Sequence, residues 1–387
     1  MLTGLEVLLQ KGLKRLKGKR IGLVVHPASV DRGLRHAAEL LIGNKELHIT
    51  ALFGPQHGIR GETQDNMIEW EGFRDERTGL PVYSLYGATR EPTPEMLNDV
   101  DVMVVDLQDV GTRVYTFAST LFLVMEACAK HGREVIVLDR PNPINGVDLE
   151  GYVLEPSFRS FVGMMELPMR HGLTMGELAQ MYKTVRKLKC SLKVVRMSGW
   201  RRKWFFTSTR LPWVMPSPNI PTTDTAIVYP GTVLFEGTNL SEGRGTTRPF
   251  EIIGAPWIKP ESLAHELNSR NLPGVHFRPL YFHPAFHKWA GELCGGVQIH
   301  ITEKEKFQPF FTAVSLLAEI HRRWGEKFQW KEPPYEYENE KLPIDIIAGT
   351  DKLRKGIEAG NTAAEMREEW EENSIDFRKF RQEFLLY

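Results

Sequence analysis

The chain has 387 residues, of which 42% are apolar and 25% are charged. This length and composition are typical of a globular protein with one large domain or two smaller ones. Lysine and arginine (49) equal aspartate and glutamate (49) in number. The chain as a whole therefore has no charge bias toward nucleic acid or an anionic membrane surface.

Targeting and redox signals are sparse. No apolar run reaches the length of a membrane span, and the basic N-terminal stretch is not followed by the apolar core of a signal peptide. The three cysteines, Cys128, Cys190 and Cys294, lie far apart and are odd in number, which predicts buried, reduced thiols. We therefore expect a cytoplasmic protein with no membrane partner.

Apolar runs alternate with helical patterns through the first half of the chain. Short runs rich in Val, Ile and Leu predict strands at 20–26, 48–53, 81–85, 102–105, 134–139 and 192–197. Helical spacing predicts helices over 114–131 and 174–188, the second with a capping-box pattern at its start. This alternation predicts βαβ units and therefore a parallel sheet of the α/β class.

The pattern changes toward the C-terminus. It predicts a helix over 262–270, a strand over 274–282, a strand over 295–302 and a long helix over 308–323. These elements indicate a second, smaller α/β domain. Residues 330–345, rich in Pro and Glu, are interpreted as a crossing loop.

Polar residues follow four of the predicted strands at the point where each one ends. They are His26, the Gly54–His57 stretch, the Asp106–Asp109 stretch and the Asp139–Asn142 stretch. The carboxyl ends of parallel strands share one edge of the sheet, and α/β proteins bind ligands outside that edge. We therefore expect these strand ends to line one edge.

The densest of these ends is DVMVVDLQDVGTR, residues 101–113. Asp106, Gln108 and Asp109 follow a buried strand, and Arg113 comes four residues later. Such residues form either a chemical site or the caps and ion pairs of a tight turn. Their density favours a site, and we interpret them as one wall of a cleft.

Two other regions are typical of a site. The segment that begins GPQHGIRGE and ends near residue 79 carries too many apolar side chains for a disordered loop, and is interpreted as a lid or a cleft wall. A glycine-rich loop between 236 and 248 carries Glu236, Asn239, Glu242 and Arg244. We expect both loops to face the 101–113 stretch.

The sequence lacks the motifs of several common enzyme classes. The chain has no G-x-G-x-x-G after its first strand and no G-x-x-x-x-G-K-[ST], so an NAD-dependent dehydrogenase or a P-loop enzyme is not expected. It has no G-x-S-x-G, no H-E-x-x-H and no paired cysteines. A metal site made from His26, His57, Asp106 and Asp109 stays open as a weaker alternative.

Carboxylate chemistry is the remaining interpretation. Glycoside hydrolysis needs an acid that protonates the leaving oxygen and usually a second carboxylate, and Asp106, Asp109, Glu236 and Glu242 are candidates. The arginines at 113 and 244 either bind an acidic group of the substrate or neutralise these carboxylates. A carboxyl paired with arginine has a lowered pKa and is a poor general acid.

Eight blocks of the sequence resemble the exo-β-N-acetylmuramidase family. They are LFGPQHGIRGE, TGLPVYSLYG, DLQDVGTRVYTF, DRPNPING, PSPNIPTTDTAIVYPGT, FEGTNLSEGRGTTRPFEIIGAPW, ELCGGVQIHIT and the terminal FLLY. The resemblance implies a Rossmann-like catalytic domain over 1–240, a smaller C-terminal α/β domain over 241–387, and a cleft between them. It also implies release of N-acetylmuramic acid from the non-reducing end of peptidoglycan fragments without a cofactor.

One position departs from the family pattern. The family block after the second strand reads Pro-Glu-His-Gly, and its glutamate is a leading candidate for the acid, whereas this chain has Gln56 before His57. A glutamine amide cannot act as a proton-donating acid. Either Glu62, Asp106 or Glu242 takes that role, or the chain is a sugar-binding or regulatory homologue whose hydrolysis is lost or altered.

The expected site residues form two groups. The candidate catalytic carboxylates are Glu62, Asp106, Glu236 and Glu242. The candidate substrate-binding residues are Gln56, His57, Gln108, Asp109, Arg113, Tyr115, Asn142, Asn239 and Arg244. The expected partner is a peptidoglycan-derived sugar or muropeptide, whose lactyl carboxylate suits the arginines, with no nucleic acid, membrane or metal involved.

Overall fold

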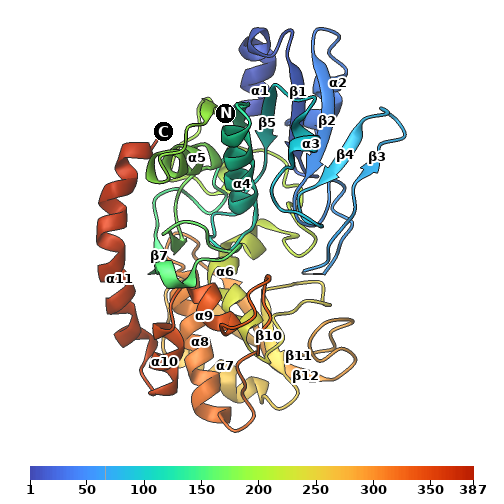
Figure 1. The fold of residues 1–387 in the computed structure, drawn as a ribbon. Coiled ribbons are helices and arrows are strands. Elements are labelled where there is room, and N and C mark those ends of the chain that lie inside the picture. The colour runs from blue at the N-terminus through green and yellow to red at the C-terminus, as the bar shows by residue number, and fades with distance from the viewer. Residues whose placement is uncertain (66) are drawn as a thin grey trace.

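A seven-stranded sheet forms the core of the N-terminal part of the protein (Figure 1). The structure is a computed structural model that describes every residue of the chain except 66. The strand order is β3-β4-β2-β1-β5-β6-β9, and all neighbours pair in parallel except β3 with β4. The strands are β1 (Arg20–Val25), β2 (His48–Gly54), β3 (Phe73–Arg74), β4 (Pro81–Ser84), β5 (Val102–Asp106), β6 (Glu134–Leu138) and β9 (Ser191–Val195).

Helices cover both faces of this sheet, which confirms the predicted α/β class. One face packs against α1 (Gly4–Val7) and α2 (Ala37–Ile42), and the other against α3 (Pro94–Leu97), α4 (Phe117–Lys130) and α5 (Met175–Val185). Successive residues of β5 alternate between the two apolar layers, as the side chains of a strand must. Burial on both faces explains the uninterrupted apolar run of this strand.

The carboxyl ends of β2, β1, β5 and β6 lie side by side at one edge of the sheet, as predicted. The strand order reverses at β1, because β2 pairs on one side of it and β5 on the other. Such a switch point is where open α/β sheets place ligands. The loops after β2 and β5 therefore leave the sheet next to a natural binding crevice.

The C-terminal part contains a three-stranded antiparallel sheet in the order β10-β12-β11. Its strands are β10 (Ile252–Ala255), β11 (Val275–Phe282) and β12 (Cys294–Ile301). The helices of this part are α6 (Thr223–Thr232), α7 (Pro260–Ser269), α8 (Pro309–Trp324), α9 (Pro343–Ala348) and α10 (Lys352–Glu358). The predicted smaller α/β unit is thus present, while its boundary after residue 240 stays a prediction.

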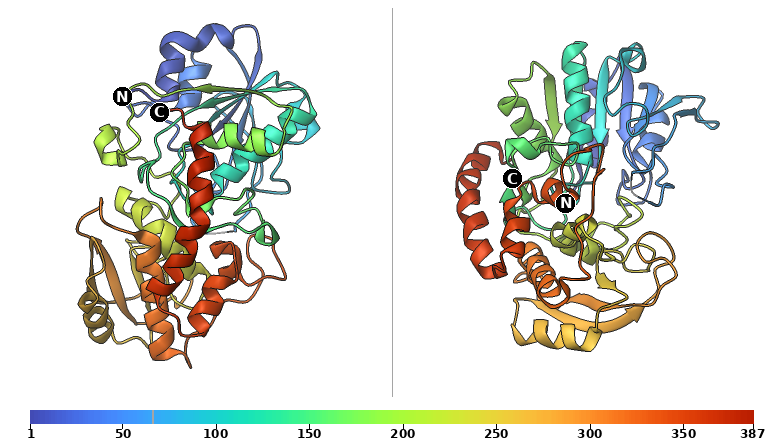
Figure 2. Two further views of the ribbon diagram at one scale, coloured as in Figure 1. Left: turned by 90° about the vertical axis from the view of Figure 1, so that its left-hand side faces the viewer. Right: turned by 60° about the horizontal axis from the view of Figure 1, so that its bottom comes forward.

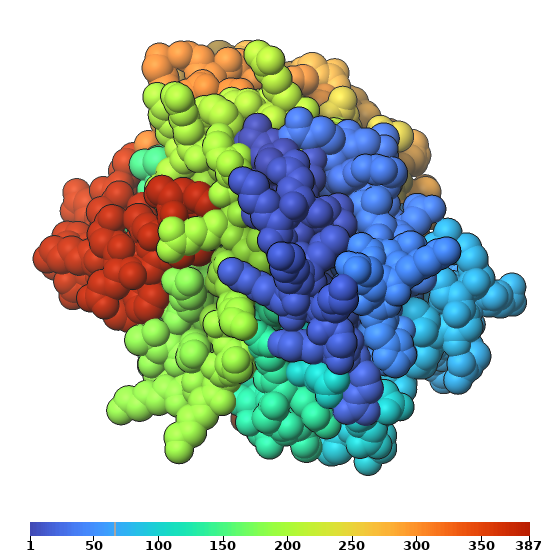
Figure 3. Space-filling model, turned by 90° about the horizontal axis from the view of Figure 1, so that it is seen from above, coloured from blue at the N-terminus to red at the C-terminus, as the bar shows by residue number. Residues whose placement is uncertain are grey.

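The last helix ties the two parts together. α11 (Ala363–Phe380) packs on α8 and on β7 (Glu150–Val153), which pairs with β8 (Pro168–Arg170), and runs along the side of the molecule toward the N-terminal part (Figure 2). Seen from above, the C-terminal residues lie against residues of the N-terminal part (Figure 3). There the Tyr387 hydroxyl donates a hydrogen bond to Asp139 Oδ2 at 2.8 Å, and the Leu386 amide donates to Glu177 Oε1 at 2.8 Å.

Two predictions about the whole chain can be compared with the fold. The three cysteines are free and buried, as expected. Within the residues that the structure describes, no helix combines the length and the apolar character needed to cross a membrane.

The hydrogen bond from Tyr387 to Asp139 yields a stability prediction. Burial, with the charge of Glu177 nearby, raises the pKa of Asp139 to about 7, and the hydrogen bond from Tyr387 opposes that rise. Tyr387→Phe should therefore lower the free energy of unfolding by ~1–3 kcal/mol, and by more at pH 8 than at pH 5, because the lost bond favours the ionised carboxylate. Urea denaturation at both pH values measures this.

The matched control is Tyr281→Phe, since Tyr281 is exposed. Equal urea midpoints for the two variants would show that the hydrogen bond from Tyr387 to Asp139 adds nothing to stability.

Candidate active site

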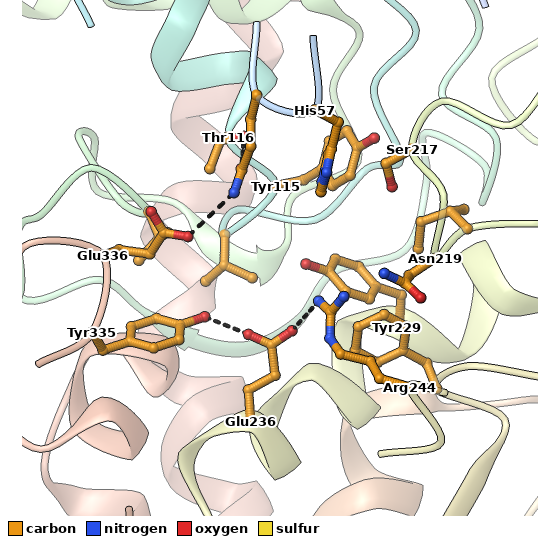
Figure 4. Close-up of a pocket in the computed structure, with 15 residues that line it drawn as sticks. His57, Tyr115, Thr116, Ser217, Asn219, Tyr229, Glu236, Arg244, Tyr335 and Glu336 are labelled. Atoms are coloured by element: carbon orange, nitrogen blue, oxygen red, sulfur yellow. Dashed lines mark hydrogen bonds and ion pairs between the residues drawn. The ribbon is translucent and has the colours of Figure 1, made fainter. Parts of the chain in front are cut away.

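A pocket lies between the two parts of the chain (Figure 4). The N-terminal part contributes the loops after β2 and β5, and the C-terminal part contributes the 3₁₀ helix η5 (Val233–Gly237), the glycine-rich loop and a turn at 335–336. The lining residues are Gln56, His57, Val114, Tyr115, Thr116, Val162, Ser217, Asn219, Ile220, Tyr229, Glu236, Arg244, Phe250, Tyr335 and Glu336.

Five residues predicted from the sequence meet in this pocket: Gln56, His57, Tyr115, Glu236 and Arg244. The loop after β2 and the glycine-rich loop therefore line one pocket. These residues come from sequence positions almost 190 apart, and the sheet edge and the packing of the two parts bring them together.

Arg244 is the central cation of the pocket. Its Nη2 donates to Glu236 Oε1 at 2.7 Å, and its Nε lies 3.3 Å from Glu242 Oε1. Its Nη1 is buried and has no hydrogen-bond partner among the residues that the structure describes. Glu236 also accepts a hydrogen bond from the Tyr335 hydroxyl at 2.7 Å. Nε is likewise without a hydrogen-bond partner among the described residues, because its contact with Glu242 is an ion pair only. The guanidinium is thus anchored through Nη2 and has N–H groups on Nη1 to offer a ligand.

Glu242 lies behind Arg244 and does not line the pocket. Burial alone would raise the pKa of this carboxyl, but Lys288, His287 and Arg244 together hold it below its usual range. Lys288 Nζ donates to Glu242 Oε2 at 2.9 Å and to the carbonyls of Phe235 and Leu240. A carboxyl that stays ionised cannot donate a proton near neutral pH, so the geometry gives Glu242 the role of positioning Arg244.

Glu336 enters the pocket from the segment that the sequence pattern marked only as a crossing loop. Its Oε2 accepts a hydrogen bond from the Tyr86 hydroxyl at 2.8 Å, and Gln56 Nε2 donates to its Oε1 at 3.4 Å. Burial, with the negative charge of Glu236, raises the pKa of Glu336 to about 7 against the opposing bond from Tyr86. A large share of this carboxyl is therefore protonated at neutral pH.

Gln56 and His57 are fixed by neighbours of their own. The Thr116 hydroxyl donates to Gln56 Oε1 at 2.7 Å, which turns the amide nitrogen toward Glu336. His57 Nδ1 lies 2.8 Å from the Thr63 carbonyl oxygen, and burial lowers the pKa of this imidazole to about 4. The ring is neutral, donates through Nδ1 and keeps Nε2 as an acceptor for a hydroxyl group.

The polar residues of the 101–113 stretch turn inward, so the prediction that they form a cleft wall is wrong. Asp106 makes a two-point ion pair with Arg140, at 2.5 and 2.8 Å, and is 1% exposed. Gln108 Nε2 donates to the carbonyls of Asp109 and Pro141, and Asp109 Oδ2 accepts from the Gly111 amide. Asp106, Gln108 and Asp109 Oδ2 have partners within the fold, whereas Asp109 Oδ1 is buried with no hydrogen-bond partner among the described residues. The pocket is lined only from Val114 onward.

Arg113 is bonded inside the protein through both of its Nη atoms. Its guanidinium donates to the carbonyls of Tyr152, Leu167 and Ile347 at 2.7 to 2.8 Å. Burial lowers the pKa of this side chain to about 9. Ile347 belongs to α9, so Arg113 joins the N-terminal part to the C-terminal part and does not reach a ligand.

The other predicted residues lie outside the pocket. The Asn142 amide donates to the Leu173 carbonyl, and the Asn239 amide donates to the Lys327 carbonyl. Glu62 is exposed. Among the described residues, no group of His, Cys, Asp and Glu side chains is placed to hold a metal ion, so the weaker metal alternative has no support in the geometry.

Comparisons with known proteins match the whole chain. The family models described as "Exo-beta-N-acetylmuramidase NamZ, N-terminal" and "C-terminal" match residues 21–224 and 227–387. The chain belongs to the NamZ family. It is 46% identical over 385 residues to the peptidoglycan beta-N-acetylmuramidase NamZ of Bacillus subtilis strain 168, covering 100% of this chain and 91% of that protein.

Two solved structures show the same fold in this family. Both are crystal structures of DUF1343 family proteins from Bacteroides fragilis NCTC 9343, and each match covers 100% of this chain and 98% of the other. One has a TM-score of 0.90 at 38% identity, and the other has a TM-score of 0.78 at 30% identity. The family resemblance and the two-part architecture inferred from the sequence blocks are confirmed.

The NamZ blocks contained some of the pocket residues that our site prediction omitted. Ser217, Asn219 and Tyr229 lie in PSPNIPTTDTAIVYPGT, a quoted block with no acidic cluster to draw notice. Glu336 lies outside every block, between two tyrosines in the run YEYENE. An acidic residue flanked by aromatic side chains was the available signal, because aromatic neighbours desolvate a carboxyl.

The position of Arg113 predicts a loss of stability without a loss of substrate affinity. Arg113→Lys should lower the free energy of unfolding by ~2–4 kcal/mol, because an ammonium group cannot reach all three carbonyls and leaves buried acceptors unpaired. Urea denaturation measures the loss, and Arg196→Lys on the exposed surface is the control.

An unchanged unfolding midpoint together with a raised KM would contradict this account. It would show that Arg113 contacts the substrate, as the sequence pattern suggested.

Proposed function

We propose that this chain is an exo-acting β-N-acetylmuramidase, a glycoside hydrolase that releases N-acetylmuramic acid from the non-reducing end of peptidoglycan fragments. Its NamZ family membership and its full-length identity to a named peptidoglycan beta-N-acetylmuramidase support this function. The observation in the structure that carries the proposal is the buried Arg244 guanidinium, which offers unpartnered N–H groups in a pocket that two carboxyl groups also line.

Arg244 gives the pocket a reason to prefer muramic acid. N-acetylmuramic acid differs from N-acetylglucosamine by a lactyl ether, which ends in a carboxylate. A charge-assisted bond from a preorganised guanidinium is about twice as strong as a neutral hydrogen bond. We assign the lactyl carboxylate to Arg244 Nη1, on the side away from Glu242.

Glu236 is assigned the second carboxylate role of the reaction. Its oxygens are held by Arg244 and Tyr335, both in the pocket lining. A carboxylate fixed in this way stabilises the positive charge that develops at the anomeric carbon and can direct a nucleophile to it. We assign the neutral His57 and Tyr115 to hydroxyl and amide groups of the sugar.

The remaining predicted residues act at a distance from the substrate. We propose that Glu242 positions Arg244, and that Asp106 and Arg113 brace the loops from which the pocket is built. The free, buried cysteines suit a reducing compartment, and we place the reaction in the cytoplasm.

Paired chromogenic substrates test the proposal. The protein should hydrolyse 4-nitrophenyl β-N-acetylmuramide and should act far less on the matching glucosaminide. Arg244→Lys should lower kcat/KM for the muramide by ~10- to 100-fold, because the ammonium group keeps the charge but cannot bond Glu236 and the lactyl carboxylate together.

Arg248→Lys is the matched control, because Arg248 lies in the same loop and its side chain is 45% exposed. Equal action of the wild-type protein on both sugars, or no muramide hydrolysis at all, would contradict the proposal.

A further inference from the structure

Glu336 sits at the tip of a strained two-residue turn. Tyr335 and Glu338 exchange both backbone hydrogen bonds, at 2.9 and 3.0 Å, so Glu336 and Tyr337 are the central residues of a tight hairpin turn. Both have left-handed backbone conformations, with φ of 45° and 69°. Turns of this kind usually take Asn-Gly, because most side chains are strained in this conformation.

The N-terminal part holds this turn in place. Tyr86 and Gln56 bond the two carboxyl oxygens of Glu336. The Tyr337 hydroxyl donates to Glu69 at 3.1 Å, and the Arg90 guanidinium lies 3.9 Å from the centre of the Tyr337 ring. Strain that the surroundings enforce is typical of functional positions, and here it delivers one carboxyl group into the pocket.

Among the residues that the structure describes, none forms an ion pair with Glu336, although the charge of Arg90 nearby lowers the pKa of this carboxyl. On the N-terminal side, Arg90 pairs with Glu69 at 2.9 Å, and Tyr86 and Gln56 are uncharged donors. On the C-terminal side, Arg244 bonds Glu236, while Tyr335 and Tyr337 are uncharged. This environment disfavours the ionised form of Glu336.

We propose that Glu336 is the general acid of this enzyme and that Gln56 and Tyr86 are the positioning residues that aim it. The inference rests on the proposed function, because it names the proton donor of the same reaction. Gln56 contacts Glu336 Oε1 at 3.4 Å, whereas Tyr86 holds Oε2 more closely at 2.8 Å. Oε1 is therefore the oxygen that carries the transferable proton.

The chemical step balances with water alone as the co-reactant. The bond from the anomeric carbon to the glycosidic oxygen breaks, and its electron pair stays on that oxygen. The oxygen takes the Glu336 proton and leaves as the hydroxyl of the next sugar or aglycone. Water supplies a hydroxyl group to the anomeric carbon, and the proton that water releases restores the Glu336 acid.

Leaving-group dependence separates an acid from a structural residue. Glu336→Gln should lower kcat by ~10²- to 10⁴-fold on a disaccharide with N-acetylmuramic acid at its non-reducing end, because the sugar alkoxide needs a proton to leave. The same variant should lose at most about tenfold on 2,4-dinitrophenyl β-N-acetylmuramide, whose phenolate departs unprotonated. Glu338→Gln, in the same turn with its side chain on Lys341, should act as wild type on both.

The outcomes separate the inference from the function on which it rests. Equal losses on both substrates, or full disaccharide hydrolysis by Glu336→Gln, would overturn the role of Glu336 while leaving the muramidase function standing. A wild-type protein that cleaves neither muramide would overturn both.

The pH profile gives an independent readout. Activity should fall as pH rises through about 7, where Glu336 loses its proton. Tyr86→Phe removes a bond that favours the ionised form, so it should move this alkaline limb to higher pH. A limb unchanged in Tyr86→Phe, or still present in Glu336→Gln, would contradict the assignment.

Discussion

The active site depends on how buried carboxyl groups and buried cations pair between the two parts of the chain. Three glutamates, Glu236, Glu242 and Glu336, are at most 4% exposed there, and Arg244 and Lys288 are the cations that bond to them. Burying an unpaired carboxylate costs several kcal/mol, so a group without a counter-ion takes up a proton instead. With two carboxylates paired, the third, Glu336, is the one whose pKa burial raises to about 7, so the pocket can offer both a protonated carboxyl and a carboxylate.

This pairing depends on the two parts keeping their places. Arg113 bonds carbonyls of both parts, and α11 carries the chain end back to Asp139 and Glu177 beside β6 and α5. The parallel sheet supplies the fixed edge from which the β2 and β5 loops project. The turn at Glu336 can then be strained, because the surrounding contacts hold it in one position.

The fold class and a third of the pocket lining, five of its fifteen residues, could be predicted from the sequence. Apolar runs located the buried strands, and the β2 loop and the Glu236–Arg244 loop do line one pocket, although the 101–113 stretch that both were expected to face does not. The sequence pattern alone could not decide whether Asp106 and Arg113 contact the substrate. A polar residue after a strand gives the same pattern whether its partner is another side chain, a backbone carbonyl or a ligand. Glu336 was missed because its partners, Tyr86 and Gln56, lie 250 and 280 positions away.

The fold compensates for the amide that Gln56 places where the family pattern has a glutamate. An amide at that position removes one carboxyl from the N-terminal wall, and the C-terminal turn places another against it, within 3.4 Å. The pocket therefore retains a protonated carboxyl, and the sequence change does not by itself argue for a protein that only binds sugars.

A crystal structure with N-acetylmuramic acid bound tests the central claim most directly. The account predicts the sugar between the two parts, with its lactyl carboxylate on Arg244 Nη1 and its anomeric hydroxyl within hydrogen-bond distance of Glu336 Oε1. A sugar bound with the lactyl group away from Arg244, or with its anomeric carbon distant from Glu336, would contradict it.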